Sequence, residues 1–169
     1  MISSEEKVQF ADVEECIHSC HIMTLATSDT KSVWAAPVYY IYLESIFYFF
    51  SKATSRHILN AKVSGTAAAS IHNNPQGWTD IKGVQMEGVV AEAGGGKKSV
   101  QAFRTYMKRF SFVKEIMSAS FSGSLKSFTE QFQVRWYMFV PEKMVYLDNS
   151  VKFGFRQQFQ CEHEGYATT

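Results

Sequence analysis

Two apolar stretches in the first third of the chain contain almost no polar positions. Residues 32–43 (SVWAAPVYYIYL) and residues 46–50 (IFYFF) lack the alternation of apolar and polar residues that is typical of a strand with one face in water. Both faces of such strands must be covered. A closed antiparallel barrel with a helix or a partner subunit packed outside it meets this requirement. Glu44 and Ser45 supply the turn between the two stretches.

The rest of the pattern predicts further strands and three helices. Helical spacing predicts helices over about residues 5–19, from residue 56 onward, and over residues 97–117. Residues 118–129 are either a loop or a short helix. We therefore expect one mainly β (α+β) domain over residues 1–169, with a loose tail at about residues 160–169. The remaining strands are predicted at residues 22–27, 66–72, 81–92, 132–140, 144–147 and 151–159, with Pro141 and Glu142 interrupting the chain before residue 144.

Composition and charge argue against several classes of protein. The 169 residues are 46% hydrophobic and 15% aromatic, which favours a packed globular domain over a disordered chain. A formal net charge of +1 argues against a general nucleic-acid or membrane-surface binder. No apolar run reaches the ~18–20 residues of a membrane-spanning helix, and residues 1–11 are too polar for a signal peptide. Three cysteines (Cys16, Cys20 and Cys161) suggest reduced thiols and hence a cytoplasmic protein.

The strongest candidate for ligand binding is the junction between the second apolar stretch and the helix that follows it. A helix N-terminus presents unpaired backbone N–H groups and a partial positive charge. Hydroxyl and basic side chains at such a position are suited to hold a phosphate. The same residue types also occur at an ordinary capped helix with its charges in solvent. The side chains at this junction are those of Ser51, Lys52, Thr54, Ser55, Arg56 and His57, with Ser55 or Thr54 as the helix N-cap.

Proline and glycine mark two of the predicted strands. Pro37 has no N–H group, so it predicts an edge position or a bulge, where neighbouring backbone N–H groups face a ligand. Gly83 and Gly88 lie inside one strand and predict a bulge, sharp coiling, or the close approach of another backbone or a ligand. Gln85 and Glu87 share one face of that strand.

Two other local patterns do not match the motifs that they resemble. Residues 94–96 (GGG) form a turn rather than a P-loop, because no GK[ST] follows at the right distance. Residues 16–21 (CIHSCH) suggest a metal or haem site, but their spacing differs from the zinc-ribbon CxxC pair and from the CxxCH motif. Cys16 and Cys20 lie four residues apart on one helix face, so we expect buried thiols and no metal.

Three segments occur in an order that is informative as a set. They are residues 47–62 (FYFFSKATSRHILNAK), the small-residue strand that ends at residue 72, and residues 78–93 (WTDIKGVQMEGVVAEA). This order resembles the pyridoxamine-5′-phosphate-oxidase-like family of flavin-binding split barrels. Residues 80–88 and residues 146–159 (YLDNSVKFGFRQQF) resemble a branch of that family that differs from the oxidase proper.

The resemblance implies a six-stranded antiparallel split β-barrel with peripheral helices, a homodimer, and one flavin mononucleotide (FMN) in each of two clefts between the subunits. It places the phosphate at the start of the second helix, the flavin ring against residues 34–38 and the glycine-containing strand, and two C-terminal contacts on the partner subunit. The cofactor-binding residues implied in this way are Trp34, Ala35, Ala36, Pro37, Val38, Ser51, Lys52, Ser55, Arg56, His57, Gln85, Tyr146 and Arg156.

The chain departs from the oxidase proper in two places. The oxidase has a basic residue at each end of its ring-contacting strand, where this chain has Trp-Ala-Ala-Pro-Val. Its C-terminal pattern is replaced here by residues 160–163 (QCEH). The resemblance therefore implies flavin binding more strongly than oxidation of pyridoxine phosphate.

Three functions are compatible with these observations. The first is an FMN-dependent oxidoreductase with an unidentified small-molecule substrate or electron donor, in which the flavin itself supplies the redox chemistry and no catalytic side chain is identified. The second is a non-catalytic flavin-binding or storage protein. The third is a split barrel that binds or degrades haem, for which the candidate axial ligands are His18, His21, His72 and His163.

Overall fold

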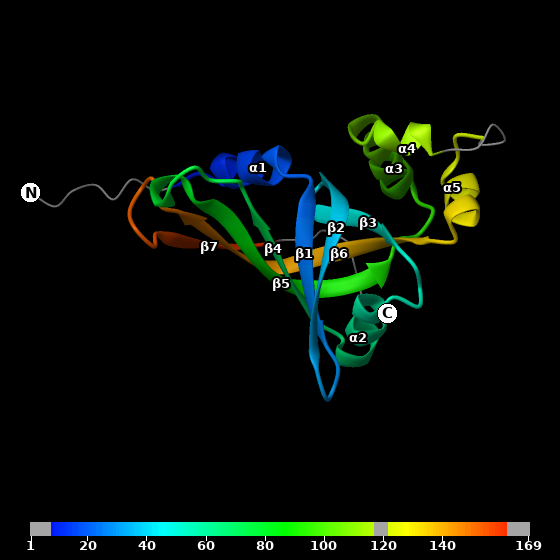
Figure 1. The fold of residues 1–169 in the computed structure, drawn as a ribbon, viewed down its shortest axis with the longest axis horizontal. Coiled ribbons are helices and arrows are strands. Elements are labelled where there is room, and N and C mark those ends of the chain that lie inside the picture. Colours follow the sequence, from blue (N-terminus) through cyan, green and yellow to red (C-terminus); the bar gives the residue numbers. More distant parts are fainter. Residues whose placement is uncertain (1–7, 117–121, 162–169) are drawn as a thin grey trace, which may run out of the picture.

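The computed structural model describes residues 8–116 and 122–161. Within these residues, six antiparallel strands close into a barrel in the order β3–β2–β1–β4–β5–β6, with β6 pairing back to β3 (Figure 1). The expected split-barrel fold is therefore confirmed. A seventh strand, β7 (Arg156–Gln160), pairs with the part of β6 that extends beyond β3. The barrel strands are β1 (Ile22–Ser28), β2 (Val33–Leu43), β3 (Ile46–Ser51), β4 (Ala67–His72), β5 (Lys82–Glu92) and β6 (Arg135–Asp148).

The apolar run of β3 is explained by two separate cores. Phe47 and Phe49 belong to the cluster that fills the barrel. Ile46 and Tyr48 belong to a second cluster outside the barrel. Because alternate residues of one strand point to opposite faces, both faces of β3 are buried, and the strand has no polar alternation.

Helices cover both the outside and the ends of the barrel. α3 (Lys97–Arg109), α4 (Phe112–Glu115) and α5 (Leu125–Phe132) gather on one side (Figure 1), and apolar side chains of α3 and α5 pack with Tyr48 and Trp136 in the second cluster. α1 (Phe10–Ser19) packs against β4 and β5, and α2 (Arg56–Ser64) packs against β1, β2 and β5. A short 3₁₀ turn, η1 (Trp78–Asp80), precedes β5. None of the helices in the described residues has the length and apolar character needed to cross a membrane.

α1 begins later than its helical spacing predicts. The helix starts at Phe10 rather than near residue 5, because Gln9 and Asp12 form a capping box in which the Gln9 N–H donates to Asp12 Oδ2 at 2.8 Å. Residues 5–7 lie outside the described part of the chain. At the other end, Arg109 of α3 donates from Nη2 to the carbonyl oxygens of His18 and Cys20, both at 2.6 Å. This arginine ties α3 to the end of α1.

The C-terminal strands also differ from the expectation. β6 continues through Pro141 without the predicted interruption, because Pro141 lies opposite Gly88 at a register shift in β5 that accommodates it. β6 begins at Arg135 rather than at residue 132, since Gln133 adopts a left-handed conformation (φ 52°) that ends α5. β7 begins only at Arg156 and includes residue 160, whereas residues 162–169 of the expected tail lie outside the described residues.

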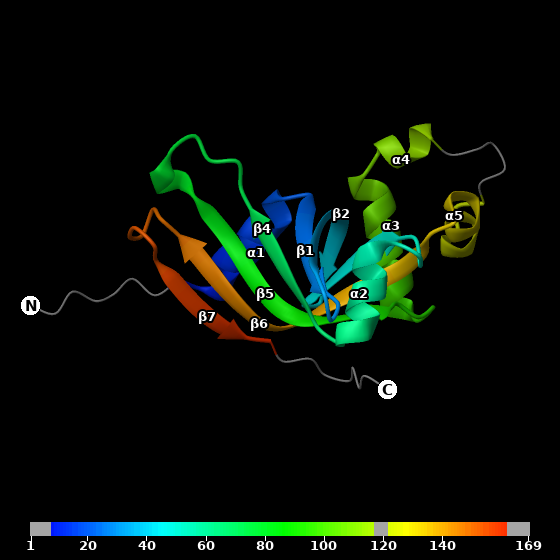
Figure 2. The same ribbon diagram turned by 60° about the horizontal axis from the view of Figure 1, so that its bottom comes forward.

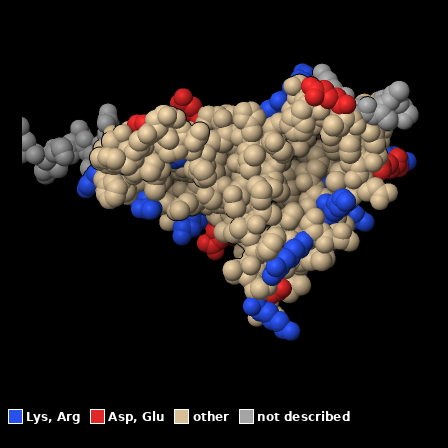
Figure 3. All heavy atoms as spheres, viewed as in Figure 1, with Lys and Arg blue, Asp and Glu red and all other residues tan. Residues whose placement is uncertain are grey.

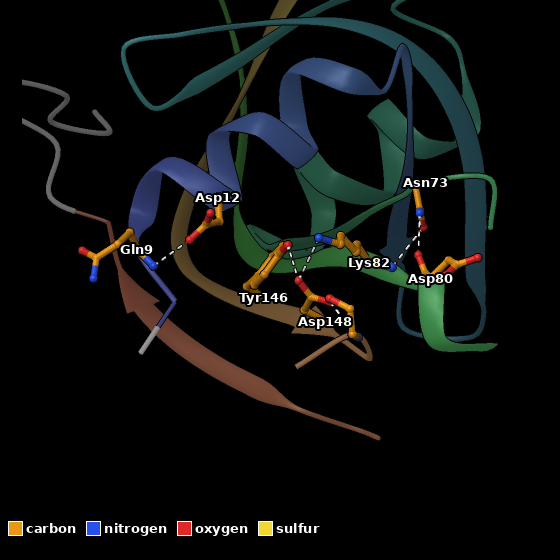
Figure 4. Close-up of polar contacts among 8 residues, drawn as sticks. Gln9, Asp12, Asn73, Asp80, Lys82, Tyr146 and Asp148 are labelled. Atoms are coloured by element: carbon orange, nitrogen blue, oxygen red, sulfur yellow. Dashed lines mark hydrogen bonds and ion pairs between the residues drawn. The ribbon is translucent and has the colours of Figure 1, made fainter. Parts of the chain in front are cut away.

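A buried carboxylate connects the ends of β5 and β6 (Figure 4). The Tyr146 hydroxyl donates to Asp148 Oδ2 at 3.1 Å, and Lys82 Nζ lies 3.1 Å from the same oxygen. The backbone N–H and the hydroxyl of Ser150 donate to Asp148 Oδ1 at 2.9 and 2.6 Å. Burial favours the neutral acid, but the bonds from Ser150 and Lys82 outweigh it and hold the pKa of Asp148 below its usual value. Tyr146 and Asp148 therefore stabilise the fold.

Candidate functional site

The start of α2 leaves backbone donors without a side-chain cap. Ser55 occupies the N-cap position, yet its side chain makes no capping hydrogen bond. Its carbonyl oxygen accepts the N–H groups of Ile58 and Leu59, both at 3.0 Å, as expected for the first turn. Lys52 is exposed and forms no ion pair with any residue that the structure describes. Basic side chains gather over α2 and the β1–β2 turn in Figure 3, so this edge suits an anion.

Arg56, the first residue of α2, is fixed above the turn between β1 and β2. Its Nη2 donates to Ser32 Oγ at 2.6 Å, and its guanidinium carbon lies 4.6 Å from the centroid of the Trp34 ring. The Ser32 hydroxyl in turn donates to Asp29 Oδ1 at 3.1 Å. The N–H groups of Lys31 and Ser32, both 2.7 Å from that oxygen, lower the pKa of Asp29. Arg56 makes no ion pair with an acid among the described residues.

His57 and Ser51 contact each other. The Ser51 hydroxyl lies 2.8 Å from His57 Nε2, and Ser51 is buried. Burial also lowers the pKa of His57, so its imidazole is neutral at pH 7. The structure therefore brings all five predicted phosphate-binding residues to one junction. Lys52 and Arg56 supply the positive charge, whereas the side chains of His57 and Ser51 are hydrogen-bond partners of each other.

The outer face of β1, β2, β4 and β5 is exposed and rich in small residues. Of the predicted ring contacts, Ala35 and Pro37 point to this face and are exposed, whereas Ala36 and Val38 point into the barrel and are buried. The strand register aligns the outward positions in two rows across the sheet. These rows are Gln85–Ser70–Thr24–Pro37 and Glu87–Ala68–Ala26–Ala35.

β2 also has an open backbone edge beside this face. Residues 33–39 pair with β1, but the described pairing of β2 with β3 is confined to residues 40–43. Pro37 therefore lies in a segment with a strand on one side only, which confirms an edge position, and the register shows no bulge there. Backbone N–H groups of this segment that point away from β1 have no strand partner, so they are available to a ligand.

The two predicted C-terminal contacts lie elsewhere in the molecule. Tyr146 is 1% exposed in the barrel core and donates to Asp148, so it presents no atom to the outer face. Arg156 is exposed on β7, with Nη1 donating to the Gly154 carbonyl at 3.3 Å. Figures 1 and 2 place β7 and α2 at distant positions along the barrel. Within one chain Arg156 therefore does not join Arg56.

Gly83 and Gly88 are required by the close packing of backbone within the sheet. A Cβ on Gly88 would lie 2.1 Å from the Val140 carbonyl oxygen, and one on Gly83 would lie 2.8 Å from the Ile71 carbonyl oxygen. Only glycine fits at such distances. The predicted close approach of neighbouring backbone is therefore confirmed at both glycines. The predicted bulge is confirmed at Gly88, where the register of β5 shifts.

Ser32, Asp29 and Thr27 were not among the predicted site residues. Thr27 lies opposite Trp34 in the register and lines a hollow of about 260 Å³ on the outer face. It is 4% exposed, and its hydroxyl has no hydrogen-bond partner in the described structure. The turn sequence DTKS (residues 29–32) could have indicated Asp29 and Ser32, because an aspartate at the start of a turn commonly accepts hydrogen bonds from the backbone N–H groups of that turn.

Histidine and cysteine side chains form no metal cluster among the described residues. The three cysteines are free thiols, and burial raises the pKa of Cys16 to about 12. Cys16 is buried as expected, while Cys20 is only half-buried. His21 and His72 line a hollow of about 530 Å³ at the end of the outer face near α1. His18 instead packs edge-on against Tyr42, and His163 lies outside the described residues.

Comparison with known proteins gives sequence relatives that are named UPF0306 proteins. No protein-family model matches the chain. A UPF0306 protein from Photorhabdus laumondii is 34% identical over 96 residues, which are 53% of this chain and 64% of that protein. A UPF0306 protein from Klebsiella pneumoniae is 25% identical over 79% of this chain and 81% of that protein. The match to the first relative thus spans less than two thirds of its length.

Solved structures with the same fold bind different cofactors. A haem-binding protein from Mycobacterium smegmatis has a TM-score of 0.68 at 15% identity and covers 91% of this chain and 59% of its own. A putative pyridoxamine 5′-phosphate oxidase from Listeria innocua has a TM-score of 0.60 at 10% identity over 81% and 96% of the two chains. An FAD-binding protein from Mesorhizobium loti has a TM-score of 0.56 at 14% identity over 81% and 90%. The protein therefore has the split-barrel fold of pyridoxamine-5′-phosphate-oxidase-like proteins.

Proposed function

We propose that this protein binds FMN and acts as a flavin-dependent oxidoreductase, with the flavin held between two copies of the chain. The observation that carries the proposal is Arg56. Its guanidinium is held by Ser32 and Trp34 at the N-terminus of α2, without an acidic ion-pair partner among the described residues. A cation fixed beside uncapped helix N–H groups is an arrangement that favours a phosphate.

The outer face of the barrel supports the second half of the proposal. Arg56 contacts Ser32 and Trp34 where β2 leaves the β1–β2 turn. The outer face, which carries Pro37 and Gln85, is not covered by the described chain. A partner subunit would cover it, and would also bury the exposed side chains of Ile22 and Tyr39. In such a dimer the partner's copy of Arg156 is the remaining predicted flavin contact.

The residues present fit a flavin. The open edge of β2 offers backbone hydrogen-bonding groups beside a surface of small side chains, where a flat ring can approach the backbone. The flavin, when bound, supplies hydride or single-electron transfer. This chain's residues then hold the phosphate, orient the ring and exclude water from one of its faces.

The first experiment is an absorbance spectrum of the purified protein after addition of excess FMN and desalting. We expect a flavin band near ~450 nm at about one equivalent per subunit. A protein that retains no flavin contradicts the proposal. Reduction of the bound flavin by a nicotinamide cofactor then distinguishes an oxidoreductase from a flavin-storage protein.

Arg56→Ala tests the phosphate contact directly. Charge-assisted bonds are worth about 1.5–3 kcal/mol, so FMN affinity should fall roughly tenfold to a hundredfold. Riboflavin, which lacks the phosphate, should bind the variant and the wild type equally. Lys62→Ala, in the last turn of the same helix, is the matched control and should leave both affinities unchanged. Equal losses for FMN and riboflavin would mean that Arg56 does not bind the phosphate.

Haem binding is a second candidate, because His21 and His72 line one hollow on the outer face. His72 Nδ1 bonds to the Asn73 carbonyl at 2.8 Å, which leaves Nε2 as the potential ligand atom. A band near ~400 nm after addition of haem, lost in His72→Ala, would support this function over the flavin.

A further inference from the structure

The loop between β5 and α3 contains three consecutive glycines that the fold does not require. A Cβ built on Gly94, Gly95 or Gly96 meets no atom within 4 Å, and none of the three has a positive φ. Gly83 and Gly88, by contrast, are needed for packing. Because these three residues have no side chains, a ligand outside the chain can approach their backbone closely.

The loop leads directly into the N-terminus of α3. Gly96 is the N-cap of this 13-residue helix, and no side chain caps it. The N–H groups of the first turn therefore point toward the loop without an acceptor in the helix, and they carry the positive end of the helix dipole.

Two side chains of this first turn add donors. Lys97 is exposed and has no ion-pair partner among the described residues. Ser99 is 6% exposed, and its hydroxyl has no hydrogen-bond partner in the described structure. A buried hydroxyl without a partner costs about 1–3 kcal/mol, so Ser99 is an independent sign that a polar group is accommodated there. Lys98 lies between these two residues, and its Nζ is 2.6 Å from Glu44 Oε2, which offsets its charge.

These groups surround a small hollow. It has a volume of about 300 Å³ and is lined by Gly94, Gly96 and residues 97–99 together with Tyr48 and Met138. The polar wall combines helix N–H groups, an ammonium group and a hydroxyl, whereas Tyr48 and Met138 form a largely apolar wall. The volume is at the small end of ligand pockets in proteins.

We propose that the 94–96 loop and the first turn of α3 bind the phosphate group of a small phosphate monoester. The phosphate oxygens accept from the first-turn N–H groups, the Ser99 hydroxyl and Lys97, and the organic part packs on Tyr48 and Met138. Lys98 remains paired with Glu44. The site is separate from the flavin site at Arg56, because its helix is α3 rather than α2 and none of its lining residues is among the predicted flavin contacts.

The test is a titration of the ¹⁵N-labelled full-length protein with inorganic phosphate, and separately with glycerol 3-phosphate, followed by amide chemical shifts. We expect saturable shifts at Gly95, Gly96 and Lys97 with both probes, and tighter binding of the ester than of inorganic phosphate. Equal or weaker binding of the ester would overturn the contact of the organic part with Tyr48 and Met138. The same shifts should persist in Arg56→Ala, which separates this site from the proposed flavin site. Absence of saturable shifts with both probes overturns the proposal.

Three variants of the site and one control variant separate binding from folding. Ser99→Ala removes an unsatisfied buried hydroxyl, so its melting temperature should be unchanged or higher while its affinity falls at least roughly threefold. Lys97→Ala/Ser99→Ala should bind at least tenfold more weakly, whereas Lys108→Ala on the same helix should bind as the wild type. Gly96→Val, for which the fold leaves room, should also lose the shifts. Wild-type affinity in the double variant and in Gly96→Val would overturn the proposal.

Discussion

The guanidinium carbon of Arg56 lies 4.6 Å from the centroid of the Trp34 ring, and this contact joins the first residue of α2 to the β1–β2 turn. Ser32 completes the arrangement by accepting from Arg56 Nη2 at 2.6 Å. An arginine on a helix ordinarily samples many rotamers, which costs free energy when it binds. Here the turn restricts it in advance, so a phosphate at α2 would meet a cation that is already oriented.

Ser32→Ala should weaken FMN binding although Ser32 itself need not touch the cofactor. Loss of one hydrogen bond of about 0.5–1.5 kcal/mol predicts a decrease of roughly twofold to tenfold in FMN affinity. Titration of flavin fluorescence measures it. In the Arg56→Ala background the same substitution should have no further effect, because Ser32 acts through the arginine. Additive losses in the double variant would contradict this role.

The barrel could be predicted because its signal is local and repeated. The uninterrupted apolar run of β3 indicates from sequence alone that both faces of the strand are buried. The start of α1 and the continuity of β6 could not be predicted in the same way. The start of α1 depends on the capping box between Gln9 and Asp12. The continuity of β6 depends on Gly88, which lies opposite Pro141 but 53 positions away in the sequence.

The candidate site likewise contains some residues that could be predicted from sequence and some contacts that could not. Lys52 and Arg56 were predictable from the helix start, because residue types at a helix N-terminus are read directly from sequence. The support from Ser32 depends on the folding back of the β1–β2 turn. Tyr146 was assigned to the flavin through the resemblance, and only the structure shows it bonded to Asp148 in the core.

His57 should make the protein less stable in mild acid. Burial holds its pKa below the ordinary value of 6.5. As the pH falls through 6.5, the unfolded chain therefore binds a proton at this residue before the folded chain does, and the free energy of unfolding decreases. Thermal melts from pH 7.5 to pH 5 should show a smaller loss in His57→Gln, which keeps a group able to bond to Ser51. An identical pH profile for the two proteins would exclude His57 as the cause.

Gly88→Ala should be among the most damaging small substitutions in the sheet. Its Cβ would meet the Val140 carbonyl oxygen at 2.1 Å, so β5 and β6 must separate at the register shift. We expect a loss of at least about 2 kcal/mol in urea denaturation. Gly95→Ala is the matched control: nothing lies near its Cβ, and its stability should change by less than about 0.5 kcal/mol.

Ala26→Arg tests the role of the outer face in assembly. Ala26 is exposed between Ala35 and Ala68 in the register, so an arginine there places a long charged side chain in the centre of the proposed interface. Light scattering coupled to size-exclusion chromatography should show a dimer for the wild type and a monomer for the variant, with loss of bound FMN. Ala11→Arg on the exposed side of α1 should remain dimeric. A monomeric wild type that binds FMN fully would contradict the shared site.

Asp148→Asn should destabilise the barrel without altering flavin binding. The carboxylate accepts from Tyr146 and Ser150 and faces Lys82, and its loss leaves these donors poorly satisfied at about 2–3 kcal/mol. Tyr146→Phe removes a single bond and should cost about 1 kcal/mol. Glu130→Gln, which breaks an exposed pair with Lys126, should have almost no effect, because surface ion pairs contribute little. Urea denaturation measures all three. If Tyr146→Phe instead lowered FMN affinity at unchanged stability, Tyr146 would have to contact the flavin as the resemblance implied.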